Sequence, residues 1–300
     1  MRLATYEAAD GGGARLGLVL GPRIVDVAAA ARSMGQGEVP DNLLAFITHG
    51  ARAQTTARGI AERFGGDTAA GDEVASVRLL APIPRPRRNV VCVGLNYTEH
   101  VAESKSVAGS EAPAYPVFFS KPPSTVIGTG AEIPWHGSVS TAIDWEVELA
   151  VIIGREGRDI AEDEAMGYVF GYTVANDVTA RDLQGRHGQW YKGKGLDGFC
   201  PLGPWVVTAD EIGDPHELDI TLRVNGVEKQ RSNTRHLIFH IPRLIAEWSA
   251  GMTLYPGDIL LTGTPSGVGI GRKPPEFLKP GDEVEAEIPA IGVLRNVVGR

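Results

Sequence analysis

The sequence predicts an α+β protein that is mainly β, in which a small N-terminal α+β domain precedes a larger β-rich roll or sandwich. Three observations predict this architecture. Short apolar runs are separated by glycine and proline, which number 38 and 20 among the 300 residues. A proline-rich segment interrupts the chain near residue 80. Beyond that segment few apolar patterns have helical spacing, so strands are expected to make up most of the larger part.

Residues 1–80 are expected to form the smaller domain. Glycine-rich turns separate three short predicted strands, at 2–6, 15–20 and 23–27. Apolar residues then recur at helical spacing and predict two helical segments, 27–34 and 42–64. Alternating prolines at 82, 84 and 86 prevent regular pairing and stiffen the connection that follows. We therefore place the domain boundary near residue 80, with the second domain spanning 81–300.

The larger domain is predicted to consist of short strands with a few helices. The strands are expected at 89–93, 117–120, 146–153, 169–176, 204–208, 218–224, 258–262 and 283–288. Asn225-Gly226 lies between two apolar runs and is a strong signal for a two-residue hairpin turn. Helical patterns are confined to three segments, 97–104, 177–184 and 241–249.

Composition excludes several classes of function. Hydrophobic residues make up 43% and charged residues 22% of the chain, which is ordinary for a globular protein with a sizeable core. A formal charge of −8 argues against nucleic-acid binding, which usually needs a basic surface. No uncharged apolar run approaches the roughly 18 residues that span a bilayer, so no membrane partner is expected. The first residues lack a secretory signal, and Cys92 and Cys200 have no metal or redox spacing. These features predict a cytoplasmic protein with two buried thiols.

The most informative stretch is 144–153, which has the pattern of a buried strand. Alternation places Val147, Leu149 and Val151 on one face and Glu146 and Glu148 on the other. Two neighbouring carboxylates on an apolar strand repel each other and are costly to desolvate. A hard divalent cation removes both penalties, because such ions prefer carboxylate oxygens. The alternative is an edge strand whose two glutamates face water.

Asp177 is a candidate third carboxylate. It lies where a predicted strand gives way to a predicted helix, a position in which aspartate is a favoured N-cap. Beside Glu146 and Glu148 it would complete a facial set of oxygen ligands that leaves positions for water and substrate. The residues alone leave both interpretations open.

His100 and Glu103 are three residues apart in a predicted helix and would share one face. A carboxylate beside an imidazole orients it and raises its basicity, which suits a general base. A solvated helix face is the alternative.

Lys194 lies between two glycines, which would let its ammonium approach a substrate oxyanion, although a flexible surface loop has the same composition. The loop 263–269 is rich in glycine and hydroxyl groups, and its amides could hold a carboxylate.

The order of these motifs resembles the fumarylacetoacetate hydrolase family. The resemblance extends from residue 89 to about residue 300 and rests on Asn96-Tyr97-x-x-His100-x-x-Glu103, Glu146-x-Glu148, Asp177-x-x-x-Arg181-Asp182-x-Gln184, Gly193-Lys194-Gly195 and Leu261-Thr262-Gly263-Thr264-Pro265-Ser266-Gly267. It implies a mixed β-roll catalytic domain, usually paired as a homodimer, and one Mg²⁺ or Mn²⁺ ion per chain.

The resemblance also implies roles for individual residues. It assigns the metal to Glu146, Glu148 and Asp177. The catalytic group would be the His100–Glu103 dyad together with Lys194. Substrate contacts would come from the remaining matched positions, Arg181, Gln184 and Thr264.

The expected reaction is hydrolytic C–C cleavage of a 2,4-dioxo acid such as an acylpyruvate, with the metal stabilising a pyruvate enolate. Because the family shares that enolate across several reactions, oxaloacetate decarboxylation and 2-oxo-dienoate isomerisation are the alternatives. A Schiff base at Lys194 and a catalytically idle metal-binding dimer are weaker ones. The Ala-, Ser- and Gly-rich segment 105–116 is expected to be a lid over the substrate.

Overall fold

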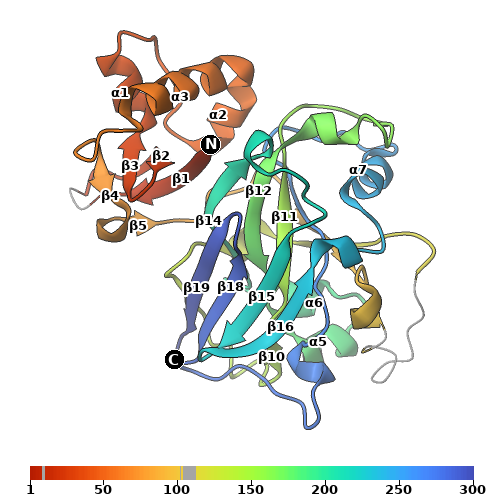
Figure 1. The fold of residues 1–300 in the computed structure, drawn as a ribbon. Coiled ribbons are helices and arrows are strands. Elements are labelled where there is room, and N and C mark those ends of the chain that lie inside the picture. The colour runs from red at the N-terminus through yellow and green to blue at the C-terminus, as the bar shows by residue number, and fades with distance from the viewer. Residues whose placement is uncertain (9–10, 102, 104–112) are drawn as a thin grey trace.

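The computed structural model describes residues 1–8, 11–101, 103 and 113–300. The predicted α+β, mainly β class is confirmed. A long twisted sheet runs through the molecule (Figure 1), and its strands follow one another in the order β4 (Asp72–Glu73), β3 (Arg23–Asp26), β2 (Ala14–Leu20), β1 (Arg2–Glu7), β14 (Cys200–Thr208), β12 (Val169–Asn176), β11 (Val147–Ile153), β17 (Ile259–Leu261), β6 (Val90–Gly94) and β7 (Val117–Lys121). Two short strands attach beside this path, β5 (Arg78–Leu79) on β1 and β8 (Val126–Ile127) on β14.

A second sheet packs against the long one and encloses the main apolar core. Its order is β16 (Val227–Asn233), β15 (Asp219–Val224), β18 (Glu283–Ile288), β19 (Gly292–Val298) and β9 (Glu132–Ile133). Val224 pairs with Val227 across Asn225-Gly226, which confirms the hairpin. A small ladder joins β10 (Ile143–Asp144) to β13 (Thr179–Ala180). The predicted strands of the larger domain are all present, whereas β8, β9, β10, β13 and β19 were not predicted.

The strands of the first 80 residues continue the long sheet. β1 pairs with β14 through Leu3 opposite Val206, so one sheet crosses the predicted boundary. One apolar core also contains residues from both sides of the predicted boundary. Within it, the rings of Phe46 and Phe170 pack edge-to-face with 6.4 Å between their centroids. The division at residue 80 stays a prediction.

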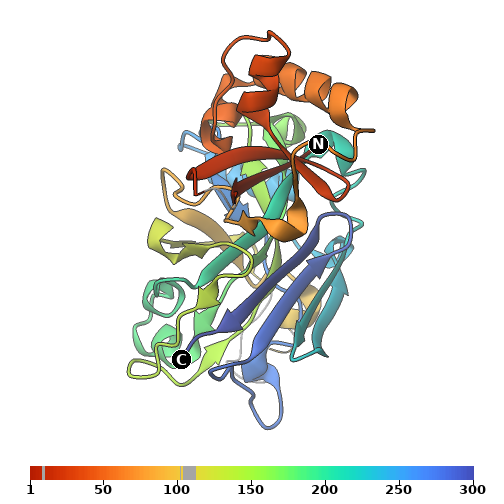
Figure 2. The ribbon, with the colours of Figure 1, turned by 90° about the vertical axis from the view of Figure 1, so that its left-hand side faces the viewer.

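Helices gather at the two ends of the molecule. The N-terminal helices α1 (Val27–Ser33), α2 (Leu43–His49) and α3 (Ala51–Phe64) cover one end, and α5 (Arg181–Arg186) and α6 (Tyr191–Lys194) lie at the other (Figures 1 and 2). The remaining long helix of the described chain is α7 (Ile241–Ser249), whose apolar side packs into the main core. No helix within the described ranges is both long and apolar enough to cross a membrane.

Two helix predictions need correction. The segment 42–64 is two helices, because Gly50 has φ of 62° and a left-handed residue ends a right-handed helix. The helix predicted at 177–184 begins only at Arg181, with Ala180 at its N-cap. Thr179 and Ala180 instead pair with β10, so Asp177 does not cap a helix.

Strand β11 lies at the centre of the long sheet and is buried along its whole length. Val147, Leu149 and Val151 enter the core between the two sheets. Ala150 and Ile152 point to the core shared with the N-terminal helices. The alternation is therefore confirmed, and the edge-strand alternative is wrong. Both cysteines are buried free thiols, as predicted.

Candidate active site

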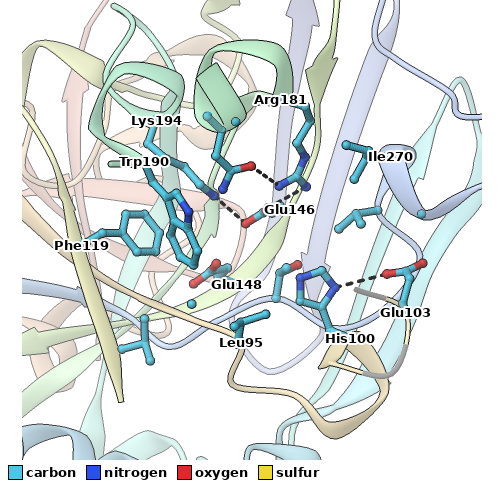
Figure 3. Close-up of a pocket in the computed structure, with 17 residues that line it drawn as sticks. Leu95, His100, Glu103, Phe119, Glu146, Glu148, Arg181, Trp190, Lys194 and Ile270 are labelled. Carbon is cyan, nitrogen blue, oxygen red and sulfur yellow. Dashed lines mark hydrogen bonds and ion pairs between the residues drawn. The ribbon is translucent and has the colours of Figure 1, made fainter. Parts of the chain in front are cut away.

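The residues singled out in the sequence converge on one cavity of about 280 Å³ (Figure 3). Eight of the nine predicted site residues line it, namely His100, Glu103, Glu146, Glu148, Arg181, Gln184, Lys194 and Thr264. Asp177, the ninth, lies directly beside Glu146 and Glu148. The segment predicted as a lid, 105–116, lies largely outside the described residues.

The three carboxylates meet because β11 and β12 pair side by side. Val147 is opposite Asn176, which places Glu146, just before β11, next to Asp177, just after β12. The Asp177 amide donates to the Glu146 carbonyl at 2.8 Å and fixes this corner. One oxygen from each of Glu146, Glu148 and Asp177 lies within 4.8 Å of the others, and all three residues are buried.

Lys194 is a buried cation between two of these carboxylates, not part of a flexible surface loop. It ends α6 and is 2% exposed. Its Nζ donates to Glu146 Oε2 at 2.8 Å and to Asp177 Oδ2 at 2.6 Å. Burial alone would lower the pKa of Lys194, but the charges of Asp177 and Glu146 outweigh burial and raise this pKa. The ammonium therefore keeps its proton in this arrangement.

Arg181 and Asp144 support the same corner. Arg181 Nη2 lies 2.7 Å from Glu146 Oε1, and its Nε donates to Asp144 Oδ2 at 2.7 Å. Burial would raise the pKa of Glu146, yet Lys194 and Arg181 lower it to about 2. Gln184 accepts from Arg181 Nη1 at 3.2 Å through its side-chain oxygen, so these two predicted substrate-contact residues also contact each other.

Asp144 supports this corner of the cavity, although it was not among the predicted site residues. Its Oδ1 accepts from the amide of Gly269 at 2.6 Å, and its Oδ2 accepts from the amide of Ile270 at 3.0 Å. The same carboxylate holds Arg181, so it ties a wall of the cavity to α5. Its position two residues before Glu146 was the only available signal.

Lys121 was also missed, although it is fully buried. It ends β7, and its Nζ donates to Asp177 Oδ1 at 2.5 Å and to the Val178 carbonyl at 3.0 Å. A lysine that ends an apolar strand before two prolines was a weak sequence signal. Asp177 therefore contacts a different lysine with each of its oxygens.

Glu148 forms no ion pair with a lysine or arginine among the described residues, and the charge of Lys194 only partly offsets its neighbours. Its Oε2 accepts from the Gly263 amide at 2.6 Å. Burial, together with the nearby charges of Asp177 and Glu146, raises the pKa of Glu148 well above its ordinary value. An added cation would relieve this repulsion. The donor set is made of hard carboxylate oxygens, and an ammonium already bridges two of them, so the residues fit a divalent metal ion.

His100 and Glu103 face the carboxylates from another wall. His100 Nδ1 lies 3.2 Å from Glu103 Oε2, and Glu103 also accepts from the Gly267 amide. Figure 3 shows His100 and Lys194 on opposite sides of Glu146. Because Glu103 engages Nδ1, the Nε2 of His100 is the atom available to a substrate. The predicted pairing is confirmed, and the solvated-face alternative is wrong because His100 is only 9% exposed.

Thr264 and two aromatic side chains complete the walls. Thr264 donates to the Val147 carbonyl at 3.0 Å and is buried in the cavity lining. Phe119 and Trp190 meet edge-to-face at 5.3 Å between ring centroids. Trp190 lies so close to Gly94 that a Cβ there would be 2.3 Å from its ring. The sequence had not indicated this aromatic wall.

Comparison with known proteins agrees with this geometry. A sequence model of the fumarylacetoacetate (FAA) hydrolase C-terminal domain matches residues 89–299. The chain belongs to the fumarylacetoacetate hydrolase family. The predicted resemblance is thereby confirmed, and the matched region contains every residue of the candidate site.

Individual members of this family show how far the similarity extends. Oxaloacetate tautomerase YisK of Bacillus subtilis is 42% identical over 285 residues, which cover 92% of this chain and 93% of that protein. The fumarylacetoacetate hydrolase structure from Exiguobacterium antarcticum superposes with a TM-score of 0.82 at 39% identity, covering 100% of this chain and 99% of the other. A maleylpyruvate hydrolase from Sphingobium, solved with manganese(II) and pyruvate, gives a TM-score of 0.76 at 33% identity, with 100% and 99% coverage. The family is thus one of enzymes with several reactions.

Proposed function

We propose that this protein catalyses keto–enol tautomerisation of oxaloacetate, or of a closely similar 2-oxo acid, with the help of one divalent cation. The observation that carries the proposal is the placement of a fixed ammonium, Lys194, and an imidazole, His100, on opposite sides of Glu146 in a buried carboxylate triad. The similarity to YisK over nearly the full chain, a protein named as an oxaloacetate tautomerase, supports the choice of reaction.

Glu146, Glu148 and Asp177 would hold the cation, for which Mg²⁺ and Mn²⁺ suit the oxygen donors equally. A bound ion would supply positive charge near the carboxylate and 2-oxo oxygens of the substrate, which would orient the substrate and favour its enol form. The manganese in the Sphingobium relative supports a divalent ion here.

His100 is the proposed acid–base group at carbon 3 of the substrate. With Nδ1 engaged by Glu103, Nε2 accepts a proton from carbon 3 in the keto-to-enol direction and returns it in reverse. The reaction consumes no water and breaks no C–C bond. Glu103 keeps the ring oriented and offsets the charge that the imidazole gains.

Lys194 is proposed to stabilise negative charge on the substrate oxygens as a protonated ammonium. Its raised pKa opposes a Schiff-base role, because a nucleophilic lysine must lose its proton. Arg181, Gln184 and Thr264 are proposed to contact the substrate from the cavity wall, as their place in the lining allows. A homodimer, which the family implies, also remains part of the proposal.

The direct test follows enol oxaloacetate by its ultraviolet absorbance after dilution into buffer with metal-loaded protein. We expect faster loss of the enol signal than with metal-stripped protein. An unchanged rate would contradict the tautomerase assignment. Formation of pyruvate and carbon dioxide would instead assign a decarboxylase.

Hydrolysis of an acylpyruvate is the second candidate. The His100–Glu103 dyad favours it, because the same base could activate a water molecule, and one relative is named a maleylpyruvate hydrolase. Proton NMR of acetylpyruvate with the metal-loaded protein distinguishes the two reactions. Appearance of acetate and pyruvate would establish the hydrolase, and an intact carbon skeleton would exclude it for this substrate.

A further inference from the structure

The aromatic wall of the cavity, formed by Phe119 and Trp190, has no part in the proposed proton transfer. Phe119 lies on β7 opposite Cys92 of β6, and Gly94 is two residues further along β6. Because paired residues and residues two apart on a strand point to the same face, Gly94 and Phe119 face the same side of this strand pair. Trp190, at the N-cap of α6, packs over that side.

Gly94 makes room for the indole ring of Trp190. A Cβ at position 94 would lie 2.3 Å from one ring carbon and 2.7 Å from another. Every larger residue would therefore push the ring out of its place. Trp190 also meets Phe119 edge-to-face, with 5.3 Å between the ring centroids. The position of the indole is thus set by contacts on two sides.

The aromatic wall adjoins the charged part of the site. The Nζ of Lys194 lies 5.0 Å from the centroid of the Phe119 ring, a distance at which a cation and an aromatic face attract each other. The same ammonium bonds to two carboxylates of the triad. Figure 3 shows both rings on the Lys194 side of the cavity, away from Glu103. A substrate bound beside the triad would therefore have the two rings next to it.

The rest of the lining offers apolar contacts but few charges for a second carboxylate of a substrate. Four aliphatic side chains extend the apolar surface, namely Val93, Leu95, Val268 and Ile270. Among the described residues of the lining, the lysine and arginine side chains are Lys194 and Arg181, and each is already paired with two acids. A carboxylate on carbon 3 of the substrate would be buried without a cation of its own, which is costly.

We propose that the cavity takes 2-oxo acids that carry a flat apolar group, such as a phenyl ring, on carbon 3, and that Trp190 is the residue that determines this specificity. The inference rests on the tautomerase activity of the proposed function and names its substrate class. The enol of an arylpyruvate is planar, because its double bond is conjugated with the ring. The whole conjugated group can therefore lie against the aromatic wall, where aromatic pairs attract each other.

The reaction of such a substrate is balanced without a further reactant. The bond between carbon 3 and its hydrogen breaks, and its electron pair becomes the double bond between carbons 2 and 3. The 2-oxo oxygen gains a proton. The same steps convert oxaloacetate, so the two substrates differ only in the group on carbon 3.

The experiment compares phenylpyruvate with oxaloacetate as substrates of the metal-loaded protein. Each is diluted from its enol form into buffer, and the loss of the enol's ultraviolet absorbance gives kcat/KM after the uncatalysed rate is subtracted. We expect the wild type to accelerate both reactions. The ratio of kcat/KM for phenylpyruvate to kcat/KM for oxaloacetate isolates the effect of the substituent, because a loss of metal, base or overall stability affects both substrates alike.

Trp190→Ala removes the indole and should lower this ratio roughly tenfold or more, because the lost apolar contact acts on the phenyl group. Trp190→Phe keeps an aromatic ring and should restore part of the ratio. Gly94→Ala keeps the tryptophan but places a methyl group where its ring lies, so the ratio should fall as well. Gly94→Ala keeps the proposal testable if Trp190→Ala does not fold.

Tyr191→Ala is the matched control. Tyr191 follows Trp190 in the chain, is 53% exposed and is not part of the cavity lining. Its replacement removes an aromatic ring from the same helix, and the ratio should stay as in the wild type.

The outcomes separate the inference from the function it rests on. Acceleration of neither reaction would overturn the tautomerase itself. Acceleration of the oxaloacetate reaction alone would overturn only the proposed substrate class. A ratio that keeps its wild-type value in both Trp190→Ala and Gly94→Ala would show that the aromatic wall does not select the substituent.

Discussion

At the scale of single residues, the site is a buried group of charged side chains in which acidic and basic residues are nearly equal in number. Lys194 and Arg181 pair with Glu146, whereas the one hydrogen bond to Glu148 among the described residues comes from a backbone amide. Because a buried charge needs a partner, Glu148 is the acid with most to gain from a bound cation. His100, by contrast, makes no hydrogen bond to any of these acids among the described contacts.

The first prediction concerns His100. His100→Ala should slow oxaloacetate tautomerisation by roughly 10²-fold or more, because it removes the proposed acid–base group. The affinity for Mn²⁺, measured by calorimetry, should remain as in the wild type, since His100 is not a proposed ligand. Turnover close to that of the wild type would show that another group transfers the proton.

The second prediction concerns Glu148. Its pKa is raised in the folded state, so the stabilisation from its bound proton is present below its ordinary pKa and is lost as pH rises through the folded value. Glu148→Gln should therefore raise the Tm of metal-free protein at pH 7, by about 2–4 °C for each kcal/mol of repulsion removed.

The same variant should lose the Tm increase that Mg²⁺ gives the wild type, because a ligand is missing. Differential scanning calorimetry with and without Mg²⁺ measures both effects. Exposed Glu228, on β16, provides the control as Glu228→Gln, which should retain the metal response. A full metal response in Glu148→Gln would remove Glu148 from the proposed ligand set.

At the scale of elements, Asp144 links β10 to α5 and to the loop that carries Gly269 and Ile270. These contacts fix Arg181 and one wall of the cavity at the same time. Asp144 is not part of the cavity lining, so it supports the site through Arg181 and this loop.

The third prediction tests this linkage. Asp144→Asn should reduce the free energy of unfolding by about 1.5–3 kcal/mol, because the buried Arg181 loses a charge-assisted hydrogen bond while Glu146 still pairs with it. Urea denaturation measures the loss. Glu276→Gln, which changes an exposed partner of Lys229, should cost less than about 1 kcal/mol. Equal losses in the two variants would contradict the role of Asp144.

Sequence patterns could predict those elements whose local signals agree with the tertiary structure. The alternation in β11 and the Asn225-Gly226 turn are of this kind. The break at Gly50 and the late start of α5 were missed, because the first depends on one glycine conformation and the second on pairing with β10. Lys121 and Trp190 could not be predicted, since their contacts join segments distant in sequence.

At the scale of the whole molecule, the N-terminal segment shares the sheet and a core with the rest of the chain. β1 is the neighbour of β14, and α2 packs Phe46 against Phe170 of β12. Removing residues 1–80 would expose an edge of β14 and the apolar face beneath the helices.

The fourth prediction follows from this shared core. The fragment 81–300 should be less soluble than the full chain and should unfold at lower temperature, because β14 becomes an exposed edge strand. Size-exclusion chromatography and calorimetry measure both properties. Separate thermal transitions in the full chain, with a well-folded 81–300 fragment, would show that the two parts are independent domains.

The predicted homodimer is tested separately, by measuring the molar mass of the full chain with light scattering.

The most direct test of the proposed chemistry is proton NMR of oxaloacetate in D₂O with Mg²⁺-loaded protein. Tautomerisation predicts that deuterium replaces the hydrogens on carbon 3 faster than with Glu148→Gln protein at the same Mg²⁺ concentration, while the carbon skeleton stays intact. Exchange no faster than with that variant would contradict the account, as would conversion of oxaloacetate to pyruvate in place of exchange.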